Sequence, residues 1–210
     1  MAAPKVVGIE TPHGPARAHV HRVPKANVAV VLGHGAGGGV SAPDLVAVTE
    51  AATAAGFTVA LVEQPYRVAG RRSPPRAPLL DAAWIAVVEY LRAGELDGLP
   101  LVTGRRSSGA RVACRTADAC GAVGVLCLAF PLQPPRREGA APAPSRLGEL
   151  EGTAVPVLIL QGERDPFGMP PSAPLRQVVV VQGDHSLRGN AREVTDAVSA
   201  WLPGLAVPAP

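Results

Sequence analysis

The chain has 210 residues, of which 47% are hydrophobic and 18% charged, and this share of apolar residues excludes a disordered protein. The longest apolar runs stay far below the roughly 20 residues of a membrane-spanning helix, so we expect no membrane segment. The net charge of +3 comes from dispersed arginines, and aromatic residues make up only 3%. Without a stacking platform or a helix that could read bases, we expect no nucleic-acid partner.

The N-terminal sequence MAAPKVVGIE lacks the charged and apolar regions of a secretory signal. Cys114, Cys120 and Cys127 are odd in number and do not have the spacing of a zinc site, so we expect buried free thiols. These features predict a reduced, cytoplasmic protein with no metal and no cofactor.

Short β-branched runs alternate with alanine-rich stretches along the whole chain, a pattern typical of an α/β fold with a mostly parallel sheet. Two segments on either side of the turn TPHGP predict an N-terminal antiparallel hairpin. Further strands are expected at 28–32, 57–63, 101–103, 123–130, 157–161 and 177–182, after hairpin strands at 6–9 and 16–22. Helices are expected at 43–55, 79–92, 108–119 and 191–202, and a proline-rich loop at 131–145. No boundary divides the series, so we expect one domain over residues 1–210 with helices on both faces of the sheet.

The sharpest local motif is TGRRSSGARVA, which runs from a predicted strand into a predicted helix. Ser107 and Gly109 fit the second half of the G-x-S-x-G turn that exposes a nucleophilic serine above a sheet. Arg105 stands where that motif has its first glycine, and RSSG is also a common helix-capping sequence. We expect Arg105 to be tolerated, with its guanidinium paired to a carboxylate such as Glu63 or reaching water.

Two later loops supply the partners that a catalytic serine needs. Asp165 lies in QGERDPFG and His185 in QGDHSLRG, each directly after a predicted strand. Taken singly, Asp165 could cap its own turn, with Glu163 as a competing acid, and His185 could be a surface residue. The order Ser107, Asp165, His185 is that of α/β-hydrolases, in which histidine acts as the base and the carboxylate orients it. The loop GHGAGGG predicts an oxyanion hole made by the N–H groups of Ala36, or alternatively Gly37, and of Ser108.

Together, LGHGAGGG, GRRSSGARVA, LQGERDPFG and GDHSL resemble small bacterial α/β-hydrolases grouped with KANL3/Tex30-like and dienelactone-hydrolase-like proteins. The resemblance runs from about Val28 to Leu202 and implies a serine hydrolase with little or no lid. It carries over Ser107 as nucleophile, Asp165 as acid and His185 as base. Dienelactone hydrolases proper use cysteine, so the serine favours a carboxylesterase-like enzyme that cleaves small soluble esters or thioesters.

Two other functions compete with this interpretation. Because Arg105 breaks the motif, the chain could be a catalytically weak or inactive scaffold with the same fold. Gly33, Gly35 and Gly38 also match G-x-G-x-x-G, with Glu63 ending the next strand as a ribose-binding acid would. Against a dinucleotide site, Pro43 places the start of the helix well beyond Gly38.

Several charged residues are candidates for substrate contact. His34 lies at the end of a predicted strand, Arg106 flanks the nucleophile turn, and Arg67 belongs to an arginine-rich loop at 67–76. If that loop covers the site, an anionic ester is favoured, whereas solvated arginines would carry no function.

Overall fold

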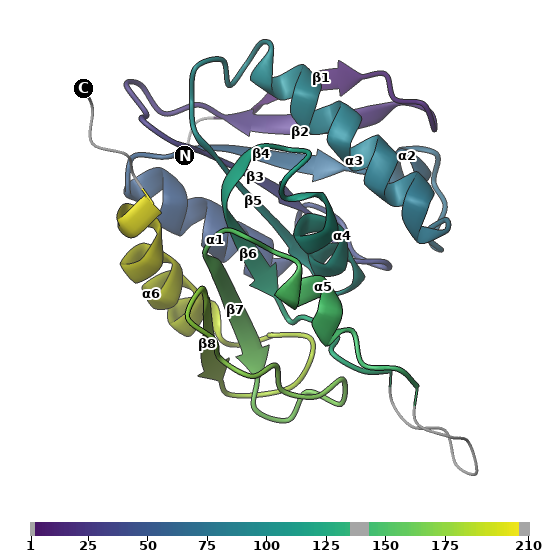
Figure 1. Ribbon diagram of the computed structural model, residues 1–210. Coiled ribbons are helices and arrows are strands. Elements are labelled where there is room, and N and C mark those ends of the chain that lie inside the picture. Colours follow the sequence, from purple (N-terminus) through teal and green to yellow (C-terminus); the bar gives the residue numbers. More distant parts are fainter. Residues whose placement is uncertain (1–2, 135–142, 206–210) are drawn as a thin grey trace.

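The computed structural model describes residues 3–134 and 143–205, which build one eight-stranded sheet in the order β1-β2-β4-β3-β5-β6-β7-β8 (Figure 1). β1 pairs antiparallel with β2, and β2 pairs antiparallel with β4, so the predicted hairpin forms one edge. All other pairs are parallel. The predicted α/β fold with a mostly parallel sheet is therefore confirmed.

The strands are β1 (Lys5–Ile9), β2 (Ala16–His21), β3 (Ala29–Gly33), β4 (Thr58–Glu63), β5 (Leu101–Arg106), β6 (Ala122–Leu128), β7 (Val157–Gly162) and β8 (Arg176–Val181). The helices are α1 (Pro43–Ala54), α2 (Pro65–Val68), α3 (Ala77–Arg92), α4 (Ser108–Thr116), α5 (Leu147–Glu151) and α6 (Ala191–Trp201), with a 3-10 turn η1 (Leu202–Leu205).

Helices cover both faces of the sheet, and the alternation of side chains along each strand divides the core between them. On β3, Val30 and Leu32 face the cluster that contains α1 and α6, whereas Ala29 and Val31 face the cluster that contains α3. α4 and α5 cover β6 and β7 on the same face as α3 (Figure 1). Every residue of β3 and β7 is buried, which explains their continuous apolar sequences.

The structure differs from the predicted elements in several places, including α4, which ends at Thr116 instead of residue 119. β5 continues to Arg106 instead of ending at Thr103, because it pairs with β3 as far as Arg105 and with β6 as far as Arg106. The short helices α2 and α5 were not predicted, since helices of one turn leave little periodicity in a sequence. The predicted proline-rich loop at 131–145 lies partly outside the described residues.

The three cysteines are buried free thiols, as predicted. Within residues 3–134 and 143–205, no helix is both long and apolar enough to cross a membrane.

Candidate active site

Ser107 occupies the turn between β5 and α4 in a backbone conformation that side-chain-bearing residues seldom adopt. Its φ is 54° and its ψ is −126°, and its N–H donates to the Leu128 carbonyl at 2.8 Å. Gly109 makes this turn possible, because a Cβ there would lie 2.7 Å from the backbone oxygen of His34. The turn therefore has the sharp geometry of a nucleophile elbow, with the N-terminus of α4 directly behind the hydroxyl.

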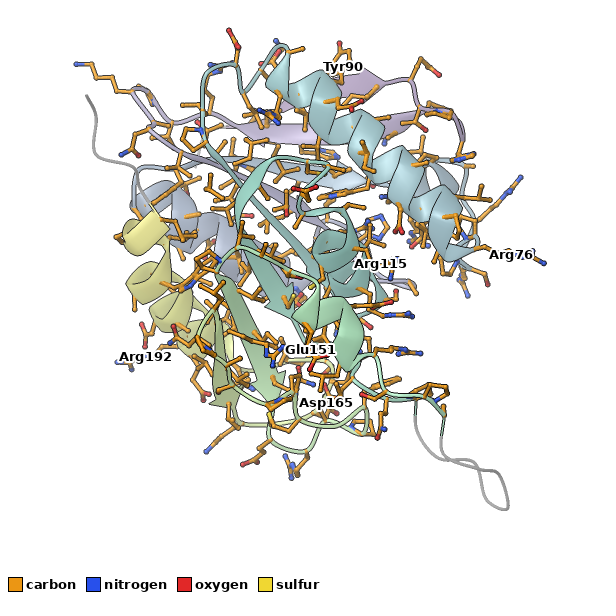
Figure 2. All side chains as sticks on the ribbon, in the orientation of Figure 1. Arg76, Tyr90, Arg115, Glu151, Asp165 and Arg192 are labelled. Atoms are coloured by element: carbon orange, nitrogen blue, oxygen red, sulfur yellow. The ribbon has the colours of Figure 1, made fainter. Side chains whose placement is uncertain are left out.

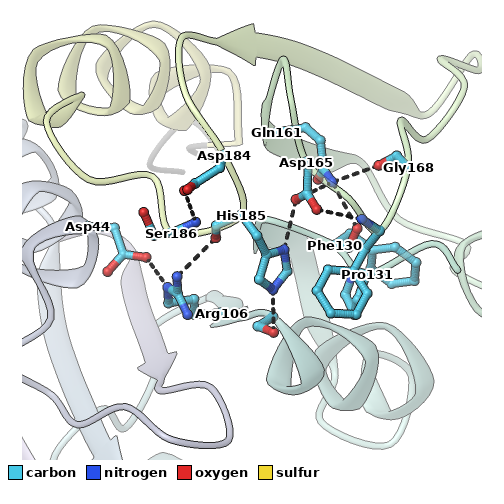
Figure 3. Close-up of polar contacts among 12 residues, drawn as sticks. Asp44, Arg106, Phe130, Pro131, Gln161, Asp165, Gly168, Asp184, His185 and Ser186 are labelled. Carbon is cyan, nitrogen blue, oxygen red and sulfur yellow. Dashed lines mark hydrogen bonds and ion pairs between the residues drawn. The ribbon is translucent and has the colours of Figure 1, made fainter. Parts of the chain in front are cut away.

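Side chains from two further loops, one between β7 and β8 and one between β8 and α6, complete a continuous hydrogen-bond chain at Ser107. The Ser107 Oγ lies 2.7 Å from His185 Nε2, and His185 Nδ1 lies 2.8 Å from Asp165 Oδ2. Figure 3 shows the imidazole of His185 between Asp165 and the start of α4. The three predicted catalytic residues therefore come together at the carboxyl ends of β5, β7 and β8.

The Asp165 carboxylate is held from both sides. Its Oδ2 accepts a hydrogen bond from Gln161 Nε2 at 2.8 Å, and its Oδ1 accepts one from the Phe167 N–H at 2.9 Å. The Asp165 side chain is fully buried, and the Phe167 ring lies 4.4 Å from the His185 ring. These contacts leave the carboxylate one direction in which to meet the histidine. Glu163, the competing acid, instead lies 3.6 Å from Arg164.

The glycine-rich loop after β3 passes directly beside the serine, since a Cβ on Gly35 would lie 3.2 Å from Ser107 Cβ. Three successive carbonyls of this loop accept hydrogen bonds from side chains. His34 O accepts from Arg105 Nη2 at 3.4 Å, Gly35 O from His34 Nδ1 at 2.8 Å, and Ala36 O from the Tyr66 hydroxyl at 2.9 Å.

Some N–H groups around Ser107 have no backbone acceptor among the described residues. Within the described part of the chain, the N–H groups of Ala36, Gly37 and Ser108 donate to no backbone acceptor. Ala36 and Gly37 belong to the loop beside Ser107, and Ser108 is the first residue of α4. These are the amides from which the sequence predicts an oxyanion hole.

The prediction that the Arg105 guanidinium reaches water or pairs with a carboxylate is wrong. The residue is 2% exposed, and its guanidinium carbon lies 4.6 Å from the centre of the Trp84 ring. Among residues 3–134 and 143–205, its one hydrogen bond is the contact to His34 O. Burial lowers the pKa of Arg105 to about 10, so it remains a cation at neutral pH. Glu63, the suggested partner, instead contacts Arg17 and His19.

Space for the Arg105 side chain comes from two glycines. A Cβ on Gly33 would lie 2.6 Å from Arg105 Nε, and a Cβ on Gly109 would lie 2.8 Å from the same atom. The first glycine of the elbow motif is thus replaced by an arginine whose stem fills the space beside two other glycines. The backbone of the elbow keeps its sharp turn.

Two residues predicted to contact substrate, His34 and Arg67, form contacts within the protein instead. His34 is fully buried, its Nε2 accepts from the Gln64 N–H at 3.1 Å, and its Nδ1 faces Gly35 O, which argues against substrate contact. Burial, and secondly the Arg105 charge, lower the pKa of His34 to about 4, so the ring is neutral. Arg67 donates to the Arg71 carbonyl at 3.2 Å.

Arg106, the third predicted substrate contact, joins two parts of the site. Its Nε donates to Asp44 Oδ2 at 2.7 Å, and its Nη2 donates to the His185 carbonyl at 3.0 Å (Figure 3). Asp44 lies in the first turn of α1 and is 3% exposed. Arg106 therefore ties the loop that carries His185 to α1, and its Nε and Nη2 donors are engaged within the protein.

Sequence reasoning missed several residues that hold the site together. They are Asp44, Tyr66, Trp84, Gln161 and Phe167. Among them only Gln161 carried a local signal, because it is a polar residue at the end of an otherwise apolar strand. In the described portion of the chain, no group of three or more His, Cys, Asp or Glu side chains could hold a metal ion.

Comparison with known proteins agrees with this geometry. The model of the alpha/beta hydrolase domain family matches residues 26–201. The chain belongs to the α/β-hydrolase family. No curated protein sequence matches the chain.

Solved structures of the same fold are similar over nearly the whole chain. A serine hydrolase without a lid from Xanthomonas campestris has a TM-score of 0.76 at 18% identity, covering 100% of this chain and 98% of that one. An esterase from Pyrococcus furiosus has a TM-score of 0.76 at 16% identity, covering 96% and 90%. A dienelactone hydrolase from Anabaena variabilis has a TM-score of 0.74 at 15% identity, covering 96% and 97%. The predicted resemblance and fold are confirmed, and hydrolase function is supported at the level of the family.

Proposed function

We propose that this α/β-hydrolase cleaves small soluble esters or thioesters through an acyl-serine intermediate, without a metal or an organic cofactor. The observation that carries the proposal is the unbroken chain from Ser107 Oγ through His185 to Asp165, at 2.7 and 2.8 Å. Both distances allow proton transfer and orientation of the imidazole.

In the first half of the reaction, Ser107 Oγ attacks the substrate carbonyl carbon while His185 Nε2 takes the hydroxyl proton. The electron pair of the carbonyl moves to its oxygen, and the N–H groups of Ser108 and Ala36 stabilise that oxyanion. The intermediate then expels the alcohol or thiol, which takes the proton from His185. Asp165 holds the imidazole and stabilises its positive charge throughout.

In the second half, water attacks the acyl-serine carbonyl and gives its proton to His185. The acid leaves, and the proton returns to Ser107. Two donors besides His185, the Gln161 Nε2 and the Phe167 N–H, hold the Asp165 carboxylate in position for this role.

Labelling with a fluorophosphonate tests the nucleophile directly. We expect the wild type to gain one phosphonyl group, detected by intact mass, and to hydrolyse p-nitrophenyl acetate. Ser107→Ala should lose both reactions, whereas Ser199→Ala, a change of an exposed serine on α6, should keep both.

A wild-type protein that is folded by circular dichroism but neither labels nor turns over an ester would contradict the proposal. It would instead support the scaffold function that the sequence left open. Loss of turnover on addition of a chelator would contradict the metal-independent mechanism.

A further inference from the structure

A cavity of about 470 Å³ lies beyond the end of β4, apart from the proposed catalytic residues. The turn between β1 and β2, helix α2, the loop after α2 and the first turns of α3 form its walls. Ser107, Asp165 and His185 are not among the residues that line it. Its volume is in the range of small-molecule sites, about 300–1,000 Å³.

Much of the wall of this cavity is apolar. The cavity is lined by the ring of Tyr66, four prolines and two leucines. The prolines are Pro15, Pro65, Pro74 and Pro75, and the leucines are Leu79 and Leu80. Leu79, one of these residues, is 40% exposed. The aromatic ring of Tyr66, together with the apolar proline side chains, suits a planar apolar ligand.

One arginine lines the cavity, and it belongs to a segment rich in positive charge. Residues 64–80 contain four arginines and no acidic residue, and Arg71 lines the cavity itself. In the described chain, none of these four arginines has a carboxylate within ion-pair distance. Asp81, the next acidic residue along the chain, is held by Arg115 at 2.7 Å. The uncompensated charge favours an anion over a neutral ligand.

The floor of the cavity is fixed by contacts with the glycine-rich loop. The Gln64 N–H donates to His34 Nε2 at 3.1 Å, and the Tyr66 hydroxyl donates to Ala36 O at 2.9 Å. Both residues are buried, and these bonds hold the Gln64 backbone and the Tyr66 hydroxyl in place, so this part of the cavity is preformed.

From these observations we infer that the cavity is a second binding site, for a small aromatic carboxylate. The ring lies between the proline faces and Tyr66, and the carboxylate meets the guanidinium of Arg71, a pairing for which the planar arginine side chain is suited. This site is independent of ester hydrolysis at Ser107.

Calorimetric titration of the Ser107→Ala protein with 1-naphthoate tests the inference without any contribution from turnover. We expect saturable binding of one equivalent, and at least fivefold weaker binding of the neutral analogue 1-naphthamide. Arg71→Glu, at an exposed position, should weaken 1-naphthoate binding at least tenfold, and Leu79→Trp should abolish it by filling the cavity.

Arg192→Glu is the matched control, because this arginine lies on α6 with an exposed side chain. Figure 2 shows Arg192 on the opposite side of the molecule from Arg76, at the start of α3. It should leave the affinity unchanged. No saturable binding, equal affinity for 1-naphthamide, or equal losses in Arg71→Glu and Arg192→Glu would each overturn the inference. Failure of fluorophosphonate labelling would leave it intact.

Discussion

The buried Arg105 side chain occupies the space that a side chain at Gly33 on β3 would need, and this can be tested by mutation. A Cβ on Gly33 would lie 2.6 Å from Arg105 Nε, 3.0 Å from Arg105 Cγ and 3.0 Å from Trp84 Cζ3. Overpacking a core costs about 1–3 kcal/mol, and here the group that must move is a desolvated cation. We therefore expect Gly33→Ala to lower the free energy of unfolding by about 3 kcal/mol.

Removing the arginine stem should relieve most of that cost. In an Arg105→Ala background the contacts with Arg105 Nε and Cγ are gone and the Trp84 contact at 3.0 Å remains, so Gly33→Ala should then cost about 1 kcal/mol. The expected coupling energy is about 2 kcal/mol, which is typical of residues in direct contact. The single change Arg105→Ala has two opposing effects of similar size. It loses buried packing, but it also removes a cation whose lowered pKa corresponds to about 3 kcal/mol against the charged form.

Urea unfolding followed by circular dichroism measures all four proteins of this cycle. Gly109→Ala is the matched control, because its Cβ would meet the backbone oxygen of His34 at 2.7 Å as well as Arg105. It should stay destabilising when Arg105 is alanine. If Gly33→Ala costs the same in both backgrounds to within about 0.5 kcal/mol, Arg105 is not what requires glycine at position 33.

Three further predictions concern the site. The neutral, buried His34, whose pKa is lowered from 6.5 to about 4, favours folding fully above pH 6.5 and progressively less as the pH falls, so about 3 kcal/mol should be lost by pH 4. Between pH 7 and pH 4, the free energy of unfolding measured with urea should fall by about 3 kcal/mol less in His34→Gln than in the wild type. An equal fall in both proteins would contradict the assignment to His34. Arg106→Met should lower the free energy of unfolding by about 3 kcal/mol, because it leaves the buried Asp44 without its cation. The same change in an Asp44→Asn background should cost much less, and an equal cost would mean that the ion pair is not the cause. Asp165→Asn should lower kcat for p-nitrophenyl acetate by about 10³–10⁴-fold with little change in Tm, and near-normal turnover would remove Asp165 from the proposed mechanism.

The sequence predicts the parts of the site that depend on strand order. Buried strands such as β3 and β7 are continuous apolar runs, and the loops that follow parallel strands meet at one edge of the sheet. The positions of Ser107, Asp165 and His185 after three different strands therefore place them together before any coordinates are known. Their local sequences add the residue types that acyl transfer needs.

The sequence alone could not predict which residues contact the supporting side chains Trp84, Asp44 and Tyr66. Trp84 lies on α3, and only the packing of that helix brings its ring against Arg105. Asp44 belongs to α1 and forms an ion pair with Arg106 at the end of β5, far away in the sequence. Tyr66 lies on α2, a helix of one turn that is too short to show a helical period in the sequence. Such contacts depend on tertiary geometry, because a polar residue has many partners of suitable chemistry along the chain.

Arg105 illustrates how a break in a motif can be compensated by the rest of the fold. The elbow motif has glycine at that position because a side chain there meets crowded backbone. In this chain the space exists, because Gly33 and Gly109 flank the stem and Trp84 covers the guanidinium. The guanidinium then donates to His34 O, one of three successive carbonyls by which side chains hold the glycine-rich loop. Since that loop carries the Ala36 N–H beside Ser107, the residue that departs from the motif also helps to fix the amide proposed to stabilise the oxyanion.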